Sequence, residues 1–382
     1  MPTIAIFMSF SGQGGVEKMV SNLARGFLQS GLEVDMVLIK SKGAHLSTIP
    51  DGANLINLQA PTSLLSLPGL VKYLRQKRPA ALLAAKDRAG RIALLARKIA
   101  GGPDKVLLRL GTHLTQSLDG KTGLQKALRY YPARWLYPWA DRIICVSQGV
   151  AEDTAAITGL PASKFRVIGN PVLNPELYEL AAKQPEDSWF EVLGEPRIVA
   201  AGRLTRQKGF DVLLGAFAEL CRQRSYRLLI LGEGPLRTQL QRQIQELELQ
   251  DKVRLAGFQP NPYPYLARAD LFVLSSRFEG SPNALKEALA LGTPVVATDC
   301  NSGPREILQN GYFGPLVPVD DPWSLARAMQ EVLDAPPEKD WLQQAVAGYT
   351  LEASSKAYLQ ELGLLNPDTG PVPEAKAREA EC

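Results

Sequence analysis

The stretch Arg277-Phe278-Glu279-Gly280-Ser281-Pro282-Asn283-Ala284-Leu285-Lys286-Glu287-Ala288 decides how the second half of this 382-residue chain folds. Ser281 is a good helix N-cap, and Pro282 suits the first helical position, where a missing N–H costs nothing. We therefore predict a loop that carries Glu279, followed by a helix that carries Glu287 on its second turn. Free N–H groups at a helix N-terminus attract phosphate, and the flanking carboxylates accept hydrogen bonds from hydroxyl groups. A nucleotide sugar presents such groups in this order.

Strands and helices alternate on both sides of this stretch, which is typical of parallel sheets covered by helices on both faces. Apolar runs predict strands at residues 4–8, 34–39, 80–85, 106–110, 142–146, 197–201, 227–231, 253–256, 271–274 and 294–297. Periodic apolar patterns predict helices at residues 15–29, 88–99, 210–224, 235–249, 283–291, 323–334 and 341–362. The chain is therefore predicted to be an α/β protein, and its length predicts two domains of roughly 150–200 residues.

Four further motifs accompany the stretch 277–288. Gly14-Gly15-Val16-Glu17 follows the first predicted strand, and Gly202-Arg203-Leu204-Thr205-Arg206-Gln207-Lys208-Gly209 follows the first strand of the second half. Residues 292–297 (GTPVVA) and 302–307 (SGPREI) come after the stretch itself. In this order and spacing the motifs resemble those of the retaining glycosyltransferases of family 4, and the resemblance runs from about residue 4 to about residue 330.

The resemblance implies the GT-B fold, in which two Rossmann-like domains with parallel sheets face an interdomain cleft. We predict an N-terminal acceptor-binding domain at residues 1–173, a proline-rich polar linker at 174–196 and a C-terminal nucleotide-sugar-binding domain at 197–340. The resemblance further implies that the helix within 341–365 crosses back to the N-terminal domain. Residues 366–382 are rich in Pro, Ala, Glu and Lys, and we predict a disordered tail there.

The two carboxylates of the stretch have different roles in such an enzyme. The resemblance implies that Glu279 contacts the sugar ring and stabilises positive charge at the anomeric carbon, as a catalytic residue. We expect Glu287 to accept hydrogen bonds from both ribose hydroxyls, which requires an ionised carboxylate. Further contacts to the donor sugar are expected from Gly280, Ser281, Pro282 and Asn283, and contacts to the nucleobase from Gly257, Phe258 and Leu285. The alternative is two surface carboxylates beside a helix N-terminus, where negative charge is mildly favourable.

Arg203 and Lys208 come at the carboxyl end of a predicted strand, where open α/β sheets bind ligands. The planar fork of an arginine and the point charge of a lysine together suit a diphosphate. Because no Asp-x-Asp metal motif is visible, we expect these cations to neutralise the leaving diphosphate with no metal and no cofactor. A pair of solvated surface cations is the alternative.

The glycine loop before residue 16 is predicted to bring backbone N–H groups of Gly14 and Gly15 close to the donor diphosphate. A dinucleotide fingerprint, Gly-x-Gly-x-x-Gly, would start at Gly12, but its third glycine position holds Glu17. The broken fingerprint argues against a nicotinamide-dependent dehydrogenase. A tight turn without a ligand remains the alternative for this loop.

His113 follows the strand at 106–110, where the family places a catalytic histidine near the sugar and the acceptor. The residue after that histidine is usually an acid or an asparagine, whereas here it is Leu114, so ordinary packing of His113 remains the alternative. Acceptor binding is predicted in the N-terminal domain, with Lys86 and Asp87 as the candidates, because they also follow a predicted strand.

Charge is distributed unevenly along the chain. Residues 1–182 carry 22 Lys and Arg against 12 Asp and Glu, a net charge of +10, and the remainder carries 21 against 27, a net charge of −6. A basic first half favours contact with anionic material, here an anionic membrane surface or a lipid-linked phosphate, although ordinary solubility charge gives the same count. Residues 126–139 mix basic and aromatic side chains, which suits either a membrane interface or a helix packed on the sheet. No motif of a nucleic-acid-binding fold is present.

Taken together, the resemblance implies a retaining glycosyltransferase that moves a sugar from a nucleoside diphosphate sugar, with UDP as the expected nucleotide, to a saccharide or lipid-linked acceptor. The resemblance implies bacterial surface polysaccharide or glycolipid synthesis. Scattered cysteines, with no export signal and no apolar run of membrane-spanning length, indicate a cytoplasmic protein, which a lipid-linked acceptor would bring to the inner face of the plasma membrane. The alternatives are a sugar-nucleotide epimerase of the same fold and a non-catalytic nucleotide-sugar-binding protein.

Overall fold

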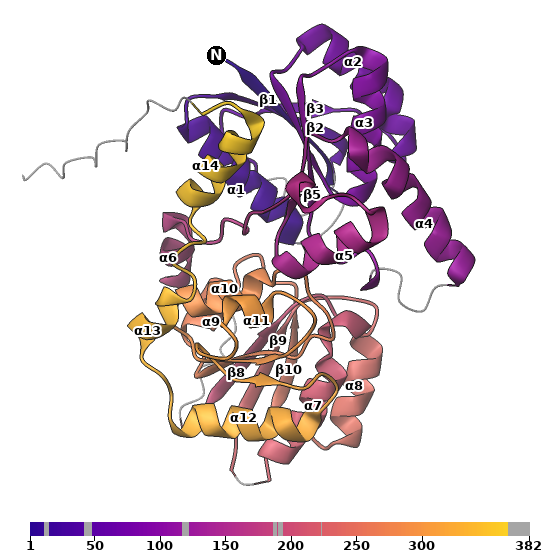
Figure 1. Cartoon of the computed structure of the whole chain (residues 1–382). Helices are drawn as coiled ribbons and strands as arrows, with labels where there is room; N and C mark the ends of the chain where they lie inside the picture. The colour runs from indigo at the N-terminus through magenta and orange to yellow at the C-terminus, as the bar shows by residue number, and fades with distance from the viewer. Residues whose placement is uncertain are drawn as a thin grey trace, which may run out of the picture.

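The structure is a computed structural model that describes residues 1–10, 15–41, 48–116, 122–185, 189, 194–222 and 224–365. It contains two α/β lobes, one formed largely by the first half of the chain and the other by the second half (Figure 1). The first lobe has a sheet of strand order β3-β2-β1-β4-β5-β6-β7, and the second lobe has a sheet of order β10-β9-β8-β11-β12-β13. Neighbouring strands run parallel in both sheets, so the predicted α/β class with two Rossmann-like lobes is confirmed.

The elements of the first lobe alternate along the chain. Its strands are β1 (Thr3–Phe10), β2 (Glu33–Ser41), β3 (Asn54–Asn57), β4 (Ala81–Ala85), β5 (Lys105–Leu110), β6 (Arg142–Cys145) and β7 (Phe165–Val167). Its helices are α1 (Gly15–Gln29), α2 (Leu67–Lys77), α3 (Asp87–Ala100), α4 (Gly123–Leu136) and α5 (Gln148–Thr158), with short 3-10 turns at η2 (Leu64–Ser66), η4 (Tyr137–Trp139) and η5 (Ala162–Lys164).

The second lobe repeats the alternation. Its strands are β8 (Arg197–Ala201), β9 (Arg227–Leu231), β10 (Val253–Gly257), β11 (Leu271–Leu274), β12 (Val295–Thr298) and β13 (Leu316–Val317). Its helices are α6 (Pro175–Ala181), α7 (Phe210–Leu220), α8 (Arg237–Glu246), α9 (Tyr263–Ala267), α10 (Asn283–Ala290), α11 (Pro304–Ile307), α12 (Pro322–Asp334) and α13 (Lys339–Gln344), with a 3-10 turn at η7 (Arg206–Lys208). The last helix of the described chain is α14 (Leu351–Leu362).

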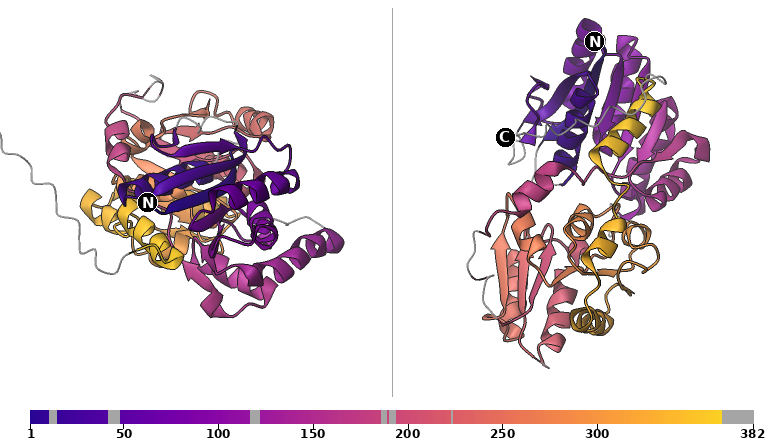
Figure 2. Two further views of the ribbon diagram at one scale, coloured as in Figure 1. Left: turned by 90° about the horizontal axis from the view of Figure 1, so that it is seen from above. Right: turned by 90° about the vertical axis from the view of Figure 1, so that its left-hand side faces the viewer.

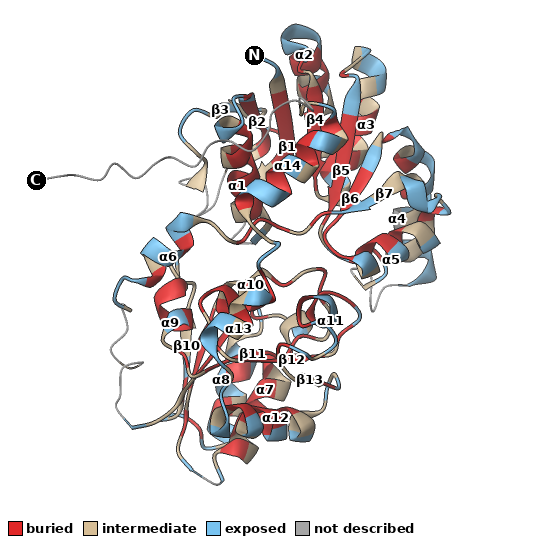
Figure 3. Ribbon diagram, turned by 60° about the vertical axis from the view of Figure 1, so that its left-hand side comes forward, coloured by how far each residue is buried: buried red, intermediate tan, exposed pale blue. Residues whose placement is uncertain are grey.

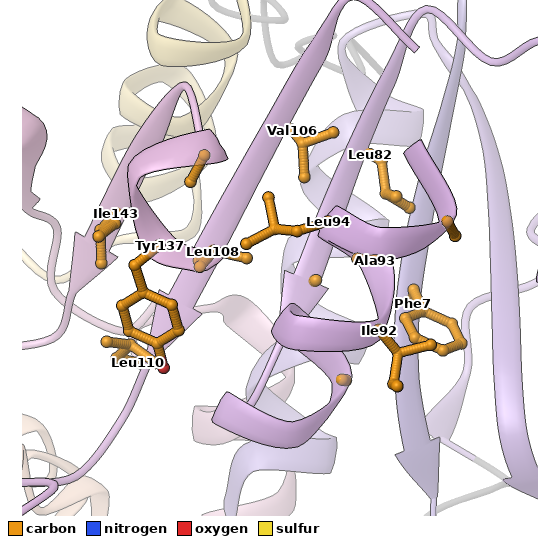
Figure 4. Packing of buried hydrophobic residues seen from close by; sticks show 14 of the residues in the cluster. Phe7, Leu82, Ile92, Ala93, Leu94, Val106, Leu108, Leu110, Tyr137 and Ile143 are labelled. Atoms are coloured by element: carbon orange, nitrogen blue, oxygen red, sulfur yellow. The ribbon is translucent and has the colours of Figure 1, made fainter. Parts of the chain in front are cut away.

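The cores lie on both faces of each sheet, which is why the central strands are continuous apolar runs. In the first lobe, Leu82 and Leu108 of the sheet pack in one cluster with Ile92 and Leu94 of α3 and with the ring of Phe7 (Figure 4). The burial map shows the same layering in both lobes, with buried strands between half-exposed helices (Figure 3). The sheets are thus rigid supports whose carboxyl ends can carry a site.

The chain passes twice between the lobes. The segment after β7 enters the second lobe, and its residues Val172 and Leu173 both donate a backbone hydrogen bond to the Tyr349 carbonyl at 3.0 Å. Tyr349 precedes α14, which lies against α1 of the first lobe (Figure 2). The rings of Phe27 on α1 and Tyr358 on α14 meet edge to face there. The segment around Val172 and the segment around Tyr349 are therefore the two connections between the lobes, and they are hydrogen-bonded to each other.

The predicted linker at residues 174–196 contains the helix α6, capped by the Asn174 side chain. Two local expectations need correction. The pattern at 341–362 forms two helices, because Thr350 caps a new helix through Ala353 N. The helix α10 begins at Asn283 with Pro282 as its cap residue, because the Ser281 hydroxyl instead accepts a hydrogen bond from Lys286 Nζ at 2.9 Å. In the described chain, no helix combines the length and the apolar character needed to cross a bilayer.

Candidate active site

The carboxyl ends of the two sheets meet where the loop after β5 faces the loop after β11. Gly280 lies so close to the other lobe that an added Cβ would come within 2.1 Å of the Gly111 carbonyl oxygen. Only glycine permits this approach of backbone to backbone, so Gly280 fixes how closely the lobes meet. The residues on either side, Glu279 and His113, are both buried at this junction, at 7% and 6% exposure.

Glu279 is held by two side chains of its own lobe. Its carboxylate oxygen Oε1 accepts hydrogen bonds from Lys208 Nζ at 2.5 Å and from Ser276 Oγ at 2.7 Å. Lys208 ends the turn η7, and its carbonyl accepts a bond from Ser275 Oγ at 2.9 Å. The predicted sugar-binding carboxylate and the predicted diphosphate-binding lysine therefore lie together, joined by an ion pair that the sequence did not reveal. Arg203 lies exposed at the end of β8.

Arg277 braces the two loops that carry this pair. Its guanidinium donates to both carboxylate oxygens of Asp211 at 2.9 and 2.7 Å, to Asp320 at 2.6 Å and to the Arg206 carbonyl at 2.8 Å. Burial alone would raise the pKa of the Asp211 carboxyl, but hydrogen bonds and charge from Arg277 outweigh it and lower that pKa. The Asp211 hydrogen bond in turn raises the pKa of Arg277.

We expect Arg277→Ala to lower the free energy of unfolding by about 2 kcal/mol, less than for a fully buried pair because the Asp211 side chain is 35% exposed. The loss should fade as the pH falls below the usual aspartate value, because Asp211, whose pKa is lowered in the folded protein, then takes up a proton. Urea unfolding at two pH values measures this. Arg277→Lys keeps the positive charge and should lose less stability. An Arg277→Ala protein as stable as wild type would refute the stabilising role of Arg277.

His113 reaches across to the second lobe. Its Nε2 lies 2.7 Å from Ser302 Oγ, and Ser302 donates its hydroxyl hydrogen to the Glu279 carbonyl at 3.0 Å. The other ring nitrogen, Nδ1, lies 3.7 Å from Asp153.

Asp153 of α5 supplies the acid that the sequence led us to seek beside His113. Its carboxylate accepts a bond from Leu114 N at 2.6 Å and contacts Thr115 as well. Burial would raise the pKa of Asp153, but hydrogen bonds from His113 and Thr115 outweigh it and lower that pKa, which favours the ionised form. The departure at Leu114 is thus compensated by a carboxylate from another helix.

Glu287 lies on α10 as predicted, and its neighbours come from both lobes. Its Oε1 accepts a bond from Tyr263 OH at 3.1 Å and lies 3.4 Å from Nζ of Lys18 on α1. The Lys18 ammonium also sits 4.1 Å from the centre of the Tyr263 ring. Lys18 was not predicted, because nothing near α1 in the sequence marks it as a partner of a carboxylate 269 residues away.

The expected nucleobase residues divide into two groups. Gly257 ends β10 with a φ of +76°, a value that favours glycine, and Phe258 follows it, half-buried. Leu285 is fully buried in the hydrophobic core of the second lobe, so it does not join the other predicted residues at the cleft.

A chain of amides connects the lobes beneath the site. Arg109, buried in β5, donates from Nη2 to Asn170 at 2.7 Å, and Asn170 donates to Asn283 at 2.9 Å. Asn283 in turn donates to the Gly15 carbonyl at 3.4 Å. Burial lowers the pKa of Arg109. Gly15 and Asn283, predicted from separate motifs, are therefore brought together, whereas Gly14 lies outside the described residues.

Lys86 and Asp87, the predicted acceptor residues, have internal partners. Lys86 Nζ bonds to the buried Glu17 at 2.8 Å and to the Ser9 carbonyl at 3.3 Å. The Asp87 carboxylate accepts two bonds from Arg91, at 2.8 and 3.0 Å, and one from Tyr137 OH at 2.7 Å. Asp87 therefore joins α3 to η4, and its contact with an acceptor stays a prediction.

A cavity of about 420 Å³ opens between the lobes, and its lining includes Thr115 and Phe278, which follow His113 by two residues and precede Glu279 by one. It lies between the loop after β5, one side of α4 and the loops that follow β8, β11 and β13. Its lining residues are Thr115, Gln116, Lys126, Arg206, Arg277, Phe278, Val319 and Asp320. Within the described ranges, no group of three His, Cys, Asp or Glu side chains is placed to hold a metal ion.

Comparison with known proteins agrees with this geometry. The family model Glycosyltransferase Family 4 matches residues 13–172, and the model Glycosyl transferases group 1 matches residues 184–347. The chain is 31% identical to the N-acetylgalactosamine-N,N'-diacetylbacillosaminyl-diphospho-undecaprenol 4-alpha-N-acetylgalactosaminyltransferase of Campylobacter jejuni, over 94% of this chain and 95% of that protein. It is 28% identical to the lipopolysaccharide core biosynthesis glycosyltransferase LpsE of Rhizobium meliloti, over 92% of this chain and 97% of that protein.

A solved structure with a similar fold is that of Anabaena HepE in complex with UDP and glucose. It superposes with a TM-score of 0.77 at 20% sequence identity, over 96% of this chain and 100% of that chain. Two facing Rossmann-like lobes, the predicted GT-B architecture, are therefore confirmed. With a match along nearly its whole length to a relative of known class, the chain belongs to the family 4 glycosyltransferases and is a glycosyltransferase.

Proposed function

We propose that the protein is a retaining glycosyltransferase that moves a sugar from a UDP-sugar to a hydroxyl of a lipid-linked saccharide, without a metal ion. The observation that carries this proposal is the ion pair between the buried Glu279 and the half-buried Lys208 at the junction of the lobes. A buried carboxylate stabilises positive charge at a reacting carbon, and the cation beside it attracts the negative charge of a leaving diphosphate. The positive charge at the anomeric carbon thus faces Glu279, and the negative charge of the leaving diphosphate faces Lys208.

The donor is held mainly by the second lobe. Lys208 and Arg203 bind the diphosphate, the latter from its exposed position at the end of β8. Glu287 accepts hydrogen bonds from the ribose hydroxyls and exchanges its contact with Lys18 for them. Backbone groups of residues 280–283 complete the contact to the sugar, as the close approach of Gly280 to Gly111 brings the sugar site against the first lobe.

The acceptor hydroxyl attacks the anomeric carbon from the face that the diphosphate leaves. The oxygen–carbon bond forms as the bond to the diphosphate breaks, and the leaving diphosphate takes the acceptor proton. The sugar therefore keeps its anomeric configuration, and no side-chain nucleophile is needed. His113, oriented by Asp153 and Ser302, lies where the acceptor and the sugar meet.

We further propose a polysaccharide or glycolipid acceptor that is anchored in the membrane. The Campylobacter relative is named for a diphospho-undecaprenol substrate, and the Rhizobium relative for lipopolysaccharide core synthesis. A basic first half, with a net charge of +10, suits contact with an anionic bilayer. The protein would then act in the cytoplasm, at the inner face of the plasma membrane.

Arg203→Ala and Lys208→Ala are each expected to weaken UDP binding about tenfold to a hundredfold, because each removes a charge-assisted hydrogen bond to the diphosphate. A thermal-shift panel of UDP-, GDP- and ADP-sugars measures this, since a ligand that binds only the folded protein raises its melting temperature. Arg222→Ala, an exposed arginine at the end of α7, is the matched control and should keep the shift. A full UDP shift in both site variants would overturn the donor site.

Product analysis separates the proposal from its alternatives. A transferase releases UDP only when an acceptor is supplied, whereas an epimerase converts the sugar nucleotide without one. A binding protein would show the thermal shift but form no product with any lipid-linked acceptor.

A further inference from the structure

The outer face of α4 carries a stripe of large apolar side chains. Leu124, Leu128, Tyr131 and Trp135 are exposed at 72%, 68%, 62% and 67%. Their spacing of four, three and four residues places them on one side of the helix. The opposite side is the one that packs, since Ala133 is fully buried.

The stripe is aromatic toward its carboxyl end. The rings of Tyr131 and Trp135 lie 6.4 Å apart, and Trp139 of η4 adds a further ring that is 40% exposed. We call these five residues the α4 face. The helix projects at the outer edge of the first lobe (Figure 1), and the burial map colours much of it as exposed (Figure 3). Tyrosine and tryptophan are the side chains that favour the boundary between water and lipid.

The charge of α4 matches an anionic surface. The helix carries Lys126, Arg129 and Arg134 and has no Asp or Glu. Arg134 is exposed next to Trp135, and Lys98 Nζ sits 5.2 Å from the centre of the Trp139 ring. Two copies of this face would bring Arg134 and Lys98 of one copy close to those of the other, whereas an anionic bilayer accepts both the apolar side chains and these two cations.

The other side of the same helix leads to the active site. Lys126 lines the cavity between the lobes together with Thr115 and Gln116, which follow His113 by two and three residues. A molecule anchored in a bilayer beneath the α4 face would thus have its polar group at the mouth of this cavity.

We propose that the α4 face docks on an anionic lipid bilayer and presents the cavity between the lobes to the membrane surface. This inference rests on the proposed function, which requires an acceptor that stays in the membrane. The docking itself needs neither donor nor acceptor, so it is measured separately from transfer.

Cosedimentation of the full chain with vesicles tests the docking. The vesicles are phosphatidylcholine with about a third phosphatidylglycerol, and phosphatidylcholine alone for comparison. Wild-type protein is expected to bind the anionic vesicles, and Tyr131→Ala/Trp135→Ala to bind them at least about tenfold more weakly, because two interfacial rings are lost. Arg134→Glu should bind more weakly as well. Trp323→Ala is the matched control, because Trp323 is 63% exposed on α12 of the other lobe, and it should bind like wild type.

The melting temperature and the UDP shift of every variant should equal those of wild type, since the α4 face lies outside the donor site. Equal vesicle binding by the Tyr131→Ala/Trp135→Ala protein would overturn the proposal, as would failure of wild type to bind anionic vesicles. A wild-type dimer that this double variant converts to a monomer would assign the face to a second copy instead. Vesicle binding without any nucleotide-sugar shift would leave the docking intact and refute the proposed donor.

Discussion

Glu279→Gln is expected to lower the rate of sugar transfer about a thousandfold while leaving the affinity for UDP within a few-fold of wild type. The substitution keeps the size of the side chain and removes its charge. Loss of one preorganised electrostatic contact in a closed site typically costs a factor of about 10² to 10³ in turnover. Because Glu279 is only 7% exposed, little water is present to take its place.

The ion pair with Lys208 makes the prediction on UDP sharper. Lys208 Nζ donates to Glu279 at 2.5 Å in the free enzyme. The negative charge of Glu279 therefore offsets part of the attraction between Lys208 and a diphosphate. When Glu279 is neutral, Lys208 attracts the diphosphate more strongly. We therefore expect the Kd for UDP to stay constant or to fall, and not to rise.

Glu287→Gln is the matched control for this experiment. It changes the other carboxylate of the same stretch, which we assign to the ribose, so it should raise the Kd for UDP while turnover at saturating donor stays within about tenfold. Steady-state transfer assays and calorimetric titration with UDP measure the two quantities. If Glu279→Gln transferred sugar at the wild-type rate, the assigned role of Glu279 would be wrong.

The sequence predicted those parts of the fold that depend on local pattern. The helix at Gly15–Gln29 and the strands at Arg197–Ala201 and Leu271–Leu274 have the bounds that their apolar periodicity indicated. Short edge strands such as β3 and β13 were missed, because a strand of four residues or two residues has no period to detect. Helix starts were harder, as at Ser281, whose hydroxyl is bound by a lysine one turn further on.

The site divides in the same way. Lys208 and Glu279 lie in two of the motifs that the resemblance rests on, so a shared site for them could be predicted. The contacts that orient them could not, since Asp153 reaches His113 from 40 residues away and Ser302 from 189 residues away. Such contacts depend on tertiary packing, which a local sequence pattern does not predict.

Lys286→Met is expected to stabilise the protein at pH 6 by about 2 kcal/mol, because an apolar side chain of similar length replaces a buried charge. Lys286 is fully buried on α10, where Nζ donates to Ser281 and lies 4.4 Å from the centre of the Tyr349 ring. Burial lowers the pKa of Lys286 to about 7, with the nearby charge of Arg109 adding to the effect.

The pH dependence follows from the direction of this shift. Between about pH 7 and the ordinary lysine value of 10.5, the unfolded chain binds more protons at this position than the folded protein does. Wild-type stability therefore gains from Lys286 as the pH rises through this window, and the full penalty remains below pH 7. The stability advantage of Lys286→Met should accordingly be largest at pH 6 and shrink toward pH 10, as urea unfolding at each pH would show.

Lys356→Met, at an exposed position of α14, is the control, because it removes a lysine that has no burial penalty and should give no such trend. A Lys286→Met protein whose advantage did not change with pH would mean that the Lys286 amine keeps its charge throughout, held by Ser281 and the Tyr349 ring.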